Sequence, residues 1–127
     1  MTGRTRCAEG RRVLVVEDEM TIVLVIEQAL QKLGAELVGP TAHLDTALRL
    51  ASEEPIDAAL LDINVRGGKS YGVADLLYAR GIPFAFCSGY GDWSIEMRHR
   101  DRPRLTKPFV DGDVETVVLT LLGISSS

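Results

Sequence analysis

Residues 13–19 read VLVVEDE, four apolar side chains followed at once by three acids. A short run that is apolar at every position is typical of a strand buried on both faces, as in a parallel sheet covered by helices on each side. Acids at the end of such a strand lie at the carboxyl edge of the sheet, where open α/β sheets bind their ligands. The stretch therefore predicts the fold class and the edge at which a site should be sought.

Three further apolar runs lead into a polar side chain that can carry chemistry. They are residues 58–61 before Asp62, residues 84–87 before Ser88, and residues 105–106 before Lys107. In parallel strands of one sheet, these side chains and the acids at 17 and 18 meet at one edge. Any one of them alone fits a solvated strand end better, but all of them at successive strand ends make coincidence improbable.

Helical patterns separate these runs, which favours βαβ units and a parallel sheet. The expected helices lie at about 21–33 with a stop at Gly34, from an N-cap at Asp45 to before Pro55, from 73 to a stop at Gly81, within 92–103, and at 114–122. A short strand at 37–38 is expected to break at Gly39-Pro40, and Gly67-Gly68 to form a loop. The count is five βα units.

The bulk properties fit one domain of ordinary composition. The chain has 127 residues, 46% of them hydrophobic, and a net charge of −4, which gives no indication of nucleic-acid binding. Its cysteines, Cys7 and Cys87, show no disulfide or metal pattern. The first residues are basic and polar, and the longest apolar run, 22–26, is too short to span a bilayer. We expect a cytoplasmic protein without nucleic-acid or membrane partners.

The carboxylates at the predicted edge indicate a metal-dependent chemistry. Two adjacent acids and a third on a neighbouring strand repel one another, and a hard divalent cation such as Mg²⁺ relieves that cost. Asp62 can then act as a nucleophile, because carboxylates form aspartyl-phosphates. Lys107 supplies positive charge for the developing negative charge, and the Ser88 hydroxyl can donate to a phosphoryl oxygen. The interpretation is a magnesium-dependent aspartate phosphorylation site.

Three of these stretches resemble the motifs of the two-component response-regulator receiver domain: VLVVEDE at 13–19, LLD at 60–62 and KPF at 107–109. The similarity covers roughly residues 12–122, and it implies a (βα)5 doubly wound parallel sheet with the flavodoxin-like strand order 2-1-3-4-5. The residues that it assigns to the site are the phosphoacceptor Asp62, the Mg²⁺ ligands Glu17, Asp18, Asp62 and Asn64 (through its backbone carbonyl), and the phosphate-binding or switch residues Lys107, Ser88 and Gly89. The Lys107-Pro108 peptide is often cis in such domains, which would aim the lysine into the cleft. The predicted boundaries are a flexible tail at 1–11, the domain at 12–123 and a disordered tail at 124–127.

A narrower resemblance is to the FAT GUY receivers, atypical and often stand-alone regulators of α-proteobacterial stress and light signalling. Residues 82–91, IPFAFCSGYG, are similar to their Phe-Ala-Thr-Gly-Tyr pattern, and residues 70–75 also look like this group. The chain departs from the pattern at Cys87-Ser88, where the serine keeps the hydroxyl, and at Arg104, where ordinary receivers carry a switch aromatic. The candidate output residues are Tyr90, Trp93 and Arg104.

The run at 22–26 is too apolar for a single buried stripe, so Val23 and Leu24 are expected to point away from the sheet. In receivers the first helix commonly docks the phosphotransfer helices of a kinase, which makes these two residues candidates for docking. The alternative is that the last helix or the N-terminal segment covers them. The implied partners are a histidine kinase or phosphotransfer protein, with a second copy of the chain as a further candidate.

The leading hypothesis is a single-domain response regulator of a phosphorelay that catalyses only its own phosphoryl transfer and dephosphorylation. Its output is either a protein contact or use as a phosphate sink that drains a shared kinase. One alternative is a pseudo-receiver that binds partners without phosphorylation, because the switch aromatic is absent. A weaker alternative is an aspartate-dependent phosphohydrolase of the haloacid dehalogenase type, which needs a second aspartate where this chain has Asn64.

Overall fold

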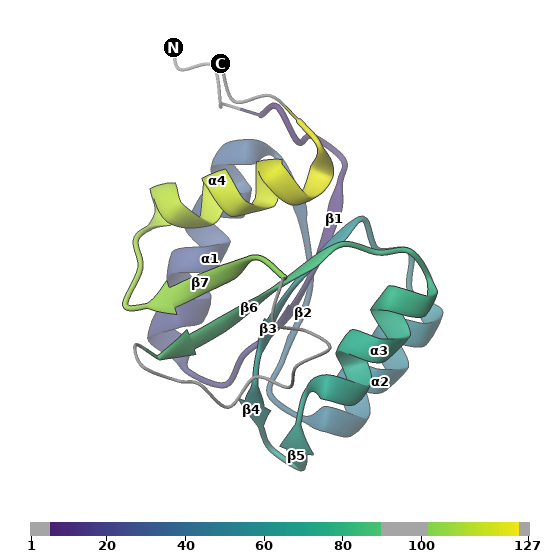
Figure 1. The fold of residues 1–127 in the computed structure, drawn as a ribbon. Helices are drawn as coiled ribbons and strands as arrows, with labels where there is room; N and C mark the ends of the chain where they lie inside the picture. Colours follow the sequence, from purple (N-terminus) through teal and green to yellow (C-terminus); the bar gives the residue numbers. More distant parts are fainter. Residues whose placement is uncertain (1–5, 90–101, 125–127) are drawn as a thin grey trace.

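The computed structural model describes residues 6–89 and 102–124, and its centre is a parallel sheet of five strands (Figure 1). The order across the sheet is β2-β1-β3-β6-β7, which is the predicted order 2-1-3-4-5 for the parallel strands. Their bounds are β1 (Arg12–Val16), β2 (Glu36–Thr41), β3 (Ala58–Asp62), β6 (Phe84–Gly89) and β7 (Arg104–Lys107).

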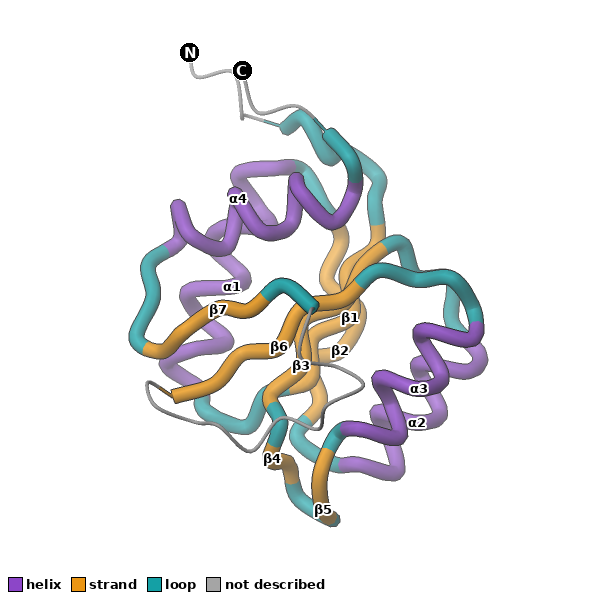
Figure 2. Tube along the Cα trace, viewed as in Figure 1, coloured by secondary structure: helices purple, strands orange, loops and turns teal. Residues whose placement is uncertain are grey.

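Helices cover both faces of the sheet, as expected for a doubly wound fold (Figure 2). One face carries α1 (Met20–Leu33) and α4 (Asp111–Leu122), and the other carries α2 (Leu44–Glu53) and α3 (Tyr71–Ala79). The helix expected within 92–103 lies outside the described residues, apart from positions 102 and 103. No helix in the described part of the chain is long and apolar enough to span a membrane.

The central strand β1 shows why the apolar runs are continuous. Leu14 and Val16 pack in the core beneath α2 and α3, whereas Val13 and Val15 pack beneath α1 and α4. Successive side chains of a strand point to opposite faces, so a strand covered on both faces needs an apolar residue at every position. The run 13–16 thus belongs to two cores at once.

The edge strand β2 continues through Gly39-Pro40, where the sequence predicted a break. Gly39 has φ +95°, and the pairing register with β1 shifts between Leu14 and Val16, which marks a bulge. A Cβ at Gly39 would lie 3.1 Å from the carbonyl oxygen of Val15. The proline is tolerated because β2 is at the edge and the strand is irregular at this point.

Two local expectations need correction on the α2 side of the sheet. The N-cap of α2 is His43, and the predicted cap, Asp45, lies in the first turn, where a negative charge suits the helix dipole. The expected loop at Gly67-Gly68 is the end of a small antiparallel hairpin formed by β4 (Asn64–Val65) and β5 (Gly68–Lys69). The hairpin is tied to the chain before α2, because the N–H of Arg66 donates to the carbonyl of Ala42 at 2.9 Å.

Residues 6–10, part of the predicted flexible tail, form turns against the end of α1. Two of their backbone N–H groups donate to the carbonyls of Lys32 and Leu33, at 2.7 and 2.9 Å. These carbonyls lie in the last turn of a helix and have no partner within it. Ala8 is 1% exposed and joins the core on the α1 side. This part of the expected tail is therefore packed, and of the tail predicted at 124–127 only residue 124 is described.

Candidate functional site

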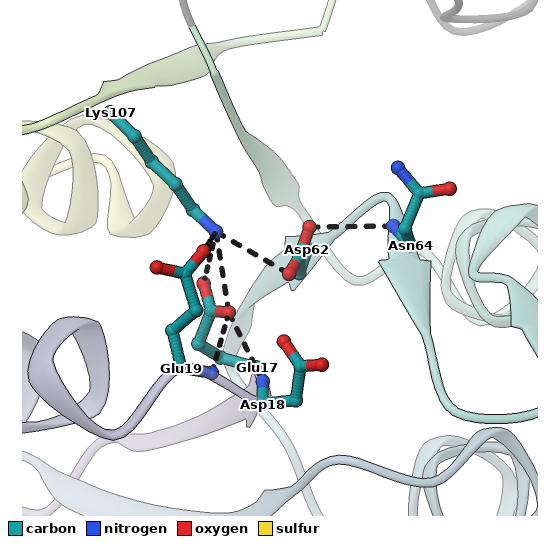
Figure 3. Close-up of polar contacts among 6 residues, drawn as sticks. All are labelled: Glu17, Asp18, Glu19, Asp62, Asn64 and Lys107. Atoms are coloured by element: carbon teal, nitrogen blue, oxygen red, sulfur yellow. Dashed lines mark hydrogen bonds and ion pairs between the residues drawn. The ribbon is translucent and has the colours of Figure 1, made fainter.

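Neighbouring parallel strands end together and bring the predicted site residues to one place (Figure 3). Glu17 and Asp18 directly follow β1, Asp62 is the last residue of β3, and Lys107 is the last residue of β7. The register pairs residue 62 with residue 87 on β6, and residue 89 on β6 with Lys107. Sequence position and strand pairing alone thus account for the convergence.

Lys107 is the centre of the polar contacts at this edge. Its Nζ lies 2.9 Å from Oε1 of Glu17, 2.9 Å from Oε1 of Glu19 and 3.4 Å from Oδ2 of Asp62. Burial by itself lowers the pKa of Lys107, but the contacts with Glu19, Glu17 and Asp62 outweigh it and leave the pKa above its usual value. The lysine is therefore a fixed positive charge beside the Asp62 carboxylate.

Glu17 is a buried carboxylate with a side chain only 1% exposed. Its Oε2 accepts the backbone N–H groups of Asp18 and Glu19, at 3.1 and 3.2 Å. Burial and, after it, the nearby Asp62 carboxyl raise the pKa of Glu17, Lys107 lowers it, and the net result is a pKa of about 7. The site therefore holds more negative charge than its one lysine balances.

The donor set fits a hard divalent cation. One carboxylate oxygen from each of Glu17, Asp18 and Asp62 lies within 4.8 Å of the others. Figure 3 shows the Asp18 carboxylate on the same side as that of Asp62, turned away from Lys107. Clustered oxygen ligands with an excess of negative charge are what Mg²⁺ binds in proteins. The residues present thus fit the expected metal, and their assignment as ligands stays a prediction.

Asn64 is held against the predicted phosphoacceptor by the β4–β5 hairpin. Its backbone N–H donates to Oδ1 of Asp62 at 3.3 Å, and its side-chain oxygen accepts from Nζ of Lys69. Residues 64 and 69 are paired across the two strands of the hairpin, so the lysine side chain contacts the residue directly opposite it. The contact with Lys69 was not foreseen, because it depends on a hairpin that the pattern did not show.

Ser88 and Gly89 lie at the end of β6, opposite Thr106 and Lys107 of β7. The Ser88 side chain is buried, and within the described residues its Oγ has no hydrogen-bond partner. A buried hydroxyl left without any partner costs free energy, so an acceptor oxygen of a ligand beside it would be stabilising. Its predicted role as the switch hydroxyl agrees with this position but is not tested by it.

One further expectation about the strand ends holds. The Lys107-Pro108 peptide is cis, as the resemblance implied. Cys87 is buried, and burial raises the pKa of its thiol above the usual value. The thiol therefore stays protonated, and Cys87 is a core residue with no part in the polar contacts of the site.

The docking and output predictions have mixed outcomes. Val23, which was expected to point away from the sheet, is only 4% exposed and so offers little surface to a partner; Leu24 is 52% exposed, as expected. Arg104 is half-buried at the start of β7, where its output role stays a prediction. The other two candidate output residues, Tyr90 and Trp93, lie outside the described residues.

Sequence reasoning also missed a role for Glu19. The residue was part of the motif at 13–19, but only the two acids before it were assigned to the site. The signal was a third consecutive acid directly after a strand. Its contact with Lys107 depends on side-chain direction, which the pattern does not specify.

Similar proteins decide the family. No family model matches the chain. The solution structure of SdrG from Sphingomonas melonis Fr1 is 43% identical in sequence and covers 88% of this chain and 96% of SdrG, with a TM-score of 0.79. The response regulator PhyR from Brucella abortus is 29% identical over 95% of this chain and 50% of PhyR, with a TM-score of 0.74.

The chain belongs to the receiver domains of response regulators.

SdrG and PhyR are of the FAT GUY type, so the narrower resemblance is confirmed as well. A solution structure of SdrG in its BeF₃-activated conformation is 44% identical and has a TM-score of 0.72, covering 87% of the receiver and 95% of SdrG. The curated relative PhyR from Methylorubrum extorquens is 28% identical over 98% of the receiver. The receiver spans about half the length of that relative, 49%.

Proposed function

We propose that this receiver accepts a phosphoryl group on Asp62 from the phosphohistidine of a histidine kinase or phosphotransfer protein. The observation that carries the proposal is the Lys107 ammonium group 3.4 Å from Oδ2 of Asp62, beside the acids Glu17 and Asp18. A carboxylate nucleophile next to a fixed positive charge and a cation-binding acid pair suits phosphoryl transfer, in which catalysis is mostly positioning and charge stabilisation.

Glu17, Asp18, Asp62 and the backbone carbonyl of Asn64 would hold Mg²⁺. The ion would supply the charge that orients and neutralises the phosphoryl oxygens when it is bound. The support for this assignment is the excess of negative charge, which burial makes costly at Glu17. SdrG adds support, because BeF₃, which activates it, is a mimic of a phosphoryl group on a carboxylate.

In the transfer step a carboxylate oxygen of Asp62 forms a bond to phosphorus while the phosphorus–nitrogen bond of the donor breaks. The electron pair of that bond stays on the imidazole nitrogen, which takes up a proton. Lys107, kept charged by its ion pairs, offsets the charge on the transferred group. The Ser88 hydroxyl, which has no partner among the described residues, would donate to a phosphoryl oxygen. Water later attacks the phosphorus and releases inorganic phosphate.

The output of the phosphorylated receiver is a protein contact or the draining of a shared kinase. A pseudo-receiver that signals without phosphorylation is the second candidate, and one observation favours it. Arg104 stands in β7 where ordinary receivers carry the aromatic that couples phosphorylation to the output surface. That departure affects the coupling and leaves the acid and lysine contacts around Asp62 in place.

Intact mass measurement tests the proposal directly. The protein is incubated with Mg²⁺ and acetyl phosphate, or with a phosphorylated kinase, as wild type, Asp62→Asn and the control Asp57→Asn. Asp57 lies outside the cluster and accepts a backbone N–H at the start of β1. A single magnesium-dependent phosphoryl adduct on wild type and on the control, absent from Asp62→Asn, is expected. An unmodified wild type beside a kinase known to be charged would favour the pseudo-receiver.

A further inference from the structure

Glu19 is the exposed member of the three carboxylates that surround the Lys107 ammonium group (Figure 3). Its Oε1 lies 2.9 Å from Nζ, as close as Oε1 of Glu17 and closer than Oδ2 of Asp62 at 3.4 Å. The Glu19 side chain is 56% exposed, whereas the Glu17 side chain is 1% exposed. Lys107 is thus shared between the buried acids and one residue at the opening of the site.

The backbone of Glu19 is fixed, so its side chain reaches the lysine from a defined position. Glu19 is the N-cap of α1, and its carbonyl accepts the N–H groups of Ile22 and Val23 at 3.1 and 3.0 Å. Its own N–H donates to Oε2 of Glu17 at 3.2 Å. The start of α1, the buried acid and the lysine therefore form one connected set of contacts.

We propose that Glu19 is a positioning residue that holds Lys107 in the unphosphorylated receiver and competes with the phosphoryl group for it. The inference rests on the proposed function, because it concerns the lysine that would contact phosphorylated Asp62. An ammonium group has three donors, and in this structure all three carboxylates draw on them. In the aspartyl phosphate the phosphoryl group carries roughly two negative charges, in place of the single charge of the Asp62 carboxylate, and three strong acceptor oxygens, so the lysine turns toward residue 62 and the exposed pair with Glu19 is the one that breaks.

The size of the effect follows from the exposure of Glu19. Ion pairs with an exposed partner contribute about 0.2 to 1 kcal/mol, which corresponds to about a 1.4- to 5-fold change in an equilibrium constant. Releasing Lys107 from Glu19 should therefore favour the phosphorylated form about 1.4- to 5-fold. The contact thus sets how readily the receiver is activated, without being required for activation.

Two substitutions separate the contact from the charge. Glu19→Gln removes the charge, whereas Glu19→Asp keeps it and withdraws the carboxylate from Lys107 by one methylene group. Glu27→Gln is the matched control, because it removes the same charge from the same helix about 12 Å further along the axis. Thermal unfolding of each variant reports any separate effect on the cap of α1.

The first measurement is the affinity of each protein for beryllofluoride at saturating Mg²⁺, obtained from an NMR titration. The second is the chemical shift of the Lys107 Nζ resonance, recorded in the same spectra. Both Glu19 variants are expected to bind beryllofluoride about 1.4- to 5-fold more tightly than wild type. Their Lys107 resonance is expected to differ from that of wild type even before beryllofluoride is added. Glu27→Gln is expected to match wild type in both measurements. Unchanged affinity in both variants would overturn the inference. Tighter binding by Glu19→Gln alone would also overturn it, since charge and not contact would then be the cause. A wild type that binds no beryllofluoride and gains no phosphoryl adduct would instead contradict the proposed function.

Discussion

At the scale of single residues, the most deeply buried of the site's carboxylates has a cost in stability. Glu17 is buried, and its pKa is raised to about 7 by burial and by the nearby Asp62 carboxyl. An acid whose pKa is higher in the folded than in the unfolded state is bound to its proton more tightly when folded. The contribution of Glu17 to stability is therefore fully present below its unfolded pKa near 4.5 and is lost as the pH rises through about 7.

Glu17→Gln should stabilise the metal-free protein at pH 8 and weaken its binding of Mg²⁺. The raised pKa, in which the ion pair with Lys107 is already counted, sets an upper limit of about 3 kcal/mol for the gain. Urea unfolding in EDTA between pH 5 and pH 8, with a parallel Mg²⁺ titration, measures both effects. The wild type should lose stability over this pH range and the variant should lose less. Equal pH profiles for wild type and variant would show that the pKa of Glu17 is not raised in solution.

The residues of the site could be predicted because each one follows a strand, and strand ends in a parallel sheet converge whatever the details of packing. Asp62 and Lys107 needed only the count of apolar runs to be placed together. Side-chain direction on a helix is different, because it depends on how the helix is rotated against its neighbours. That is why the run at 22–26 left open whether Val23 is exposed or covered, and why the contact of Glu19 with Lys107 was missed.

At the scale of elements, β2 is a strand that continues in the sheet through two residues at which its local sequence predicts a break. Gly39-Pro40 reads as a strand break in isolation, since proline cannot donate and glycine favours turns. Pairing with β1 overrides that preference, and the positive φ of Gly39 forms the bulge. The β4–β5 hairpin was hidden for a related reason, because each of its strands has only two residues and shows no periodicity.

Gly39→Ala should destabilise the protein by about 1–3 kcal/mol. The new methyl group would sit at φ +95° and 3.1 Å from the carbonyl oxygen of Val15, so backbone strain and a close contact add up. Gly112→Ala in α4 is the matched control, because a Cβ there meets nothing within 4 Å, and it should be neutral or stabilising by up to about 1 kcal/mol. Denaturant unfolding of both variants measures the difference. Equal stabilities would mean that the bulge in β2 does not persist in solution.

At the scale of the whole molecule, the two faces of the sheet are completed differently. The face under α2 and α3 is closed by those helices and the strands, whereas the face under α1 and α4 also receives Ala8 from the N-terminal segment. The polar composition of residues 1–12 concealed this contribution, because a single alanine gives no pattern. The backbone N–H of Ala8 donates to the carbonyl of Leu33 in the last turn of α1. The folded part of the chain therefore begins before the predicted boundary at residue 12.

Ala8→Asp should therefore lower the free energy of unfolding by about 2–4 kcal/mol, because it places a carboxylate in a position that is 1% exposed and lined by apolar side chains. Glu9→Ala is the control in the same segment; it removes an exposed ion pair with Arg6 and should leave the free energy of unfolding nearly unchanged. Urea unfolding followed by circular dichroism gives both values, and hydrogen exchange at the N–H of Ala8 reports its bond to the carbonyl of Leu33. Because the site lies at the opposite, carboxyl edge of the sheet, phosphorylation of the folded Ala8→Asp fraction should match wild type. An Ala8→Asp protein as stable as wild type, with rapid exchange at residue 8 in both, would mean that the segment does not belong to the folded domain.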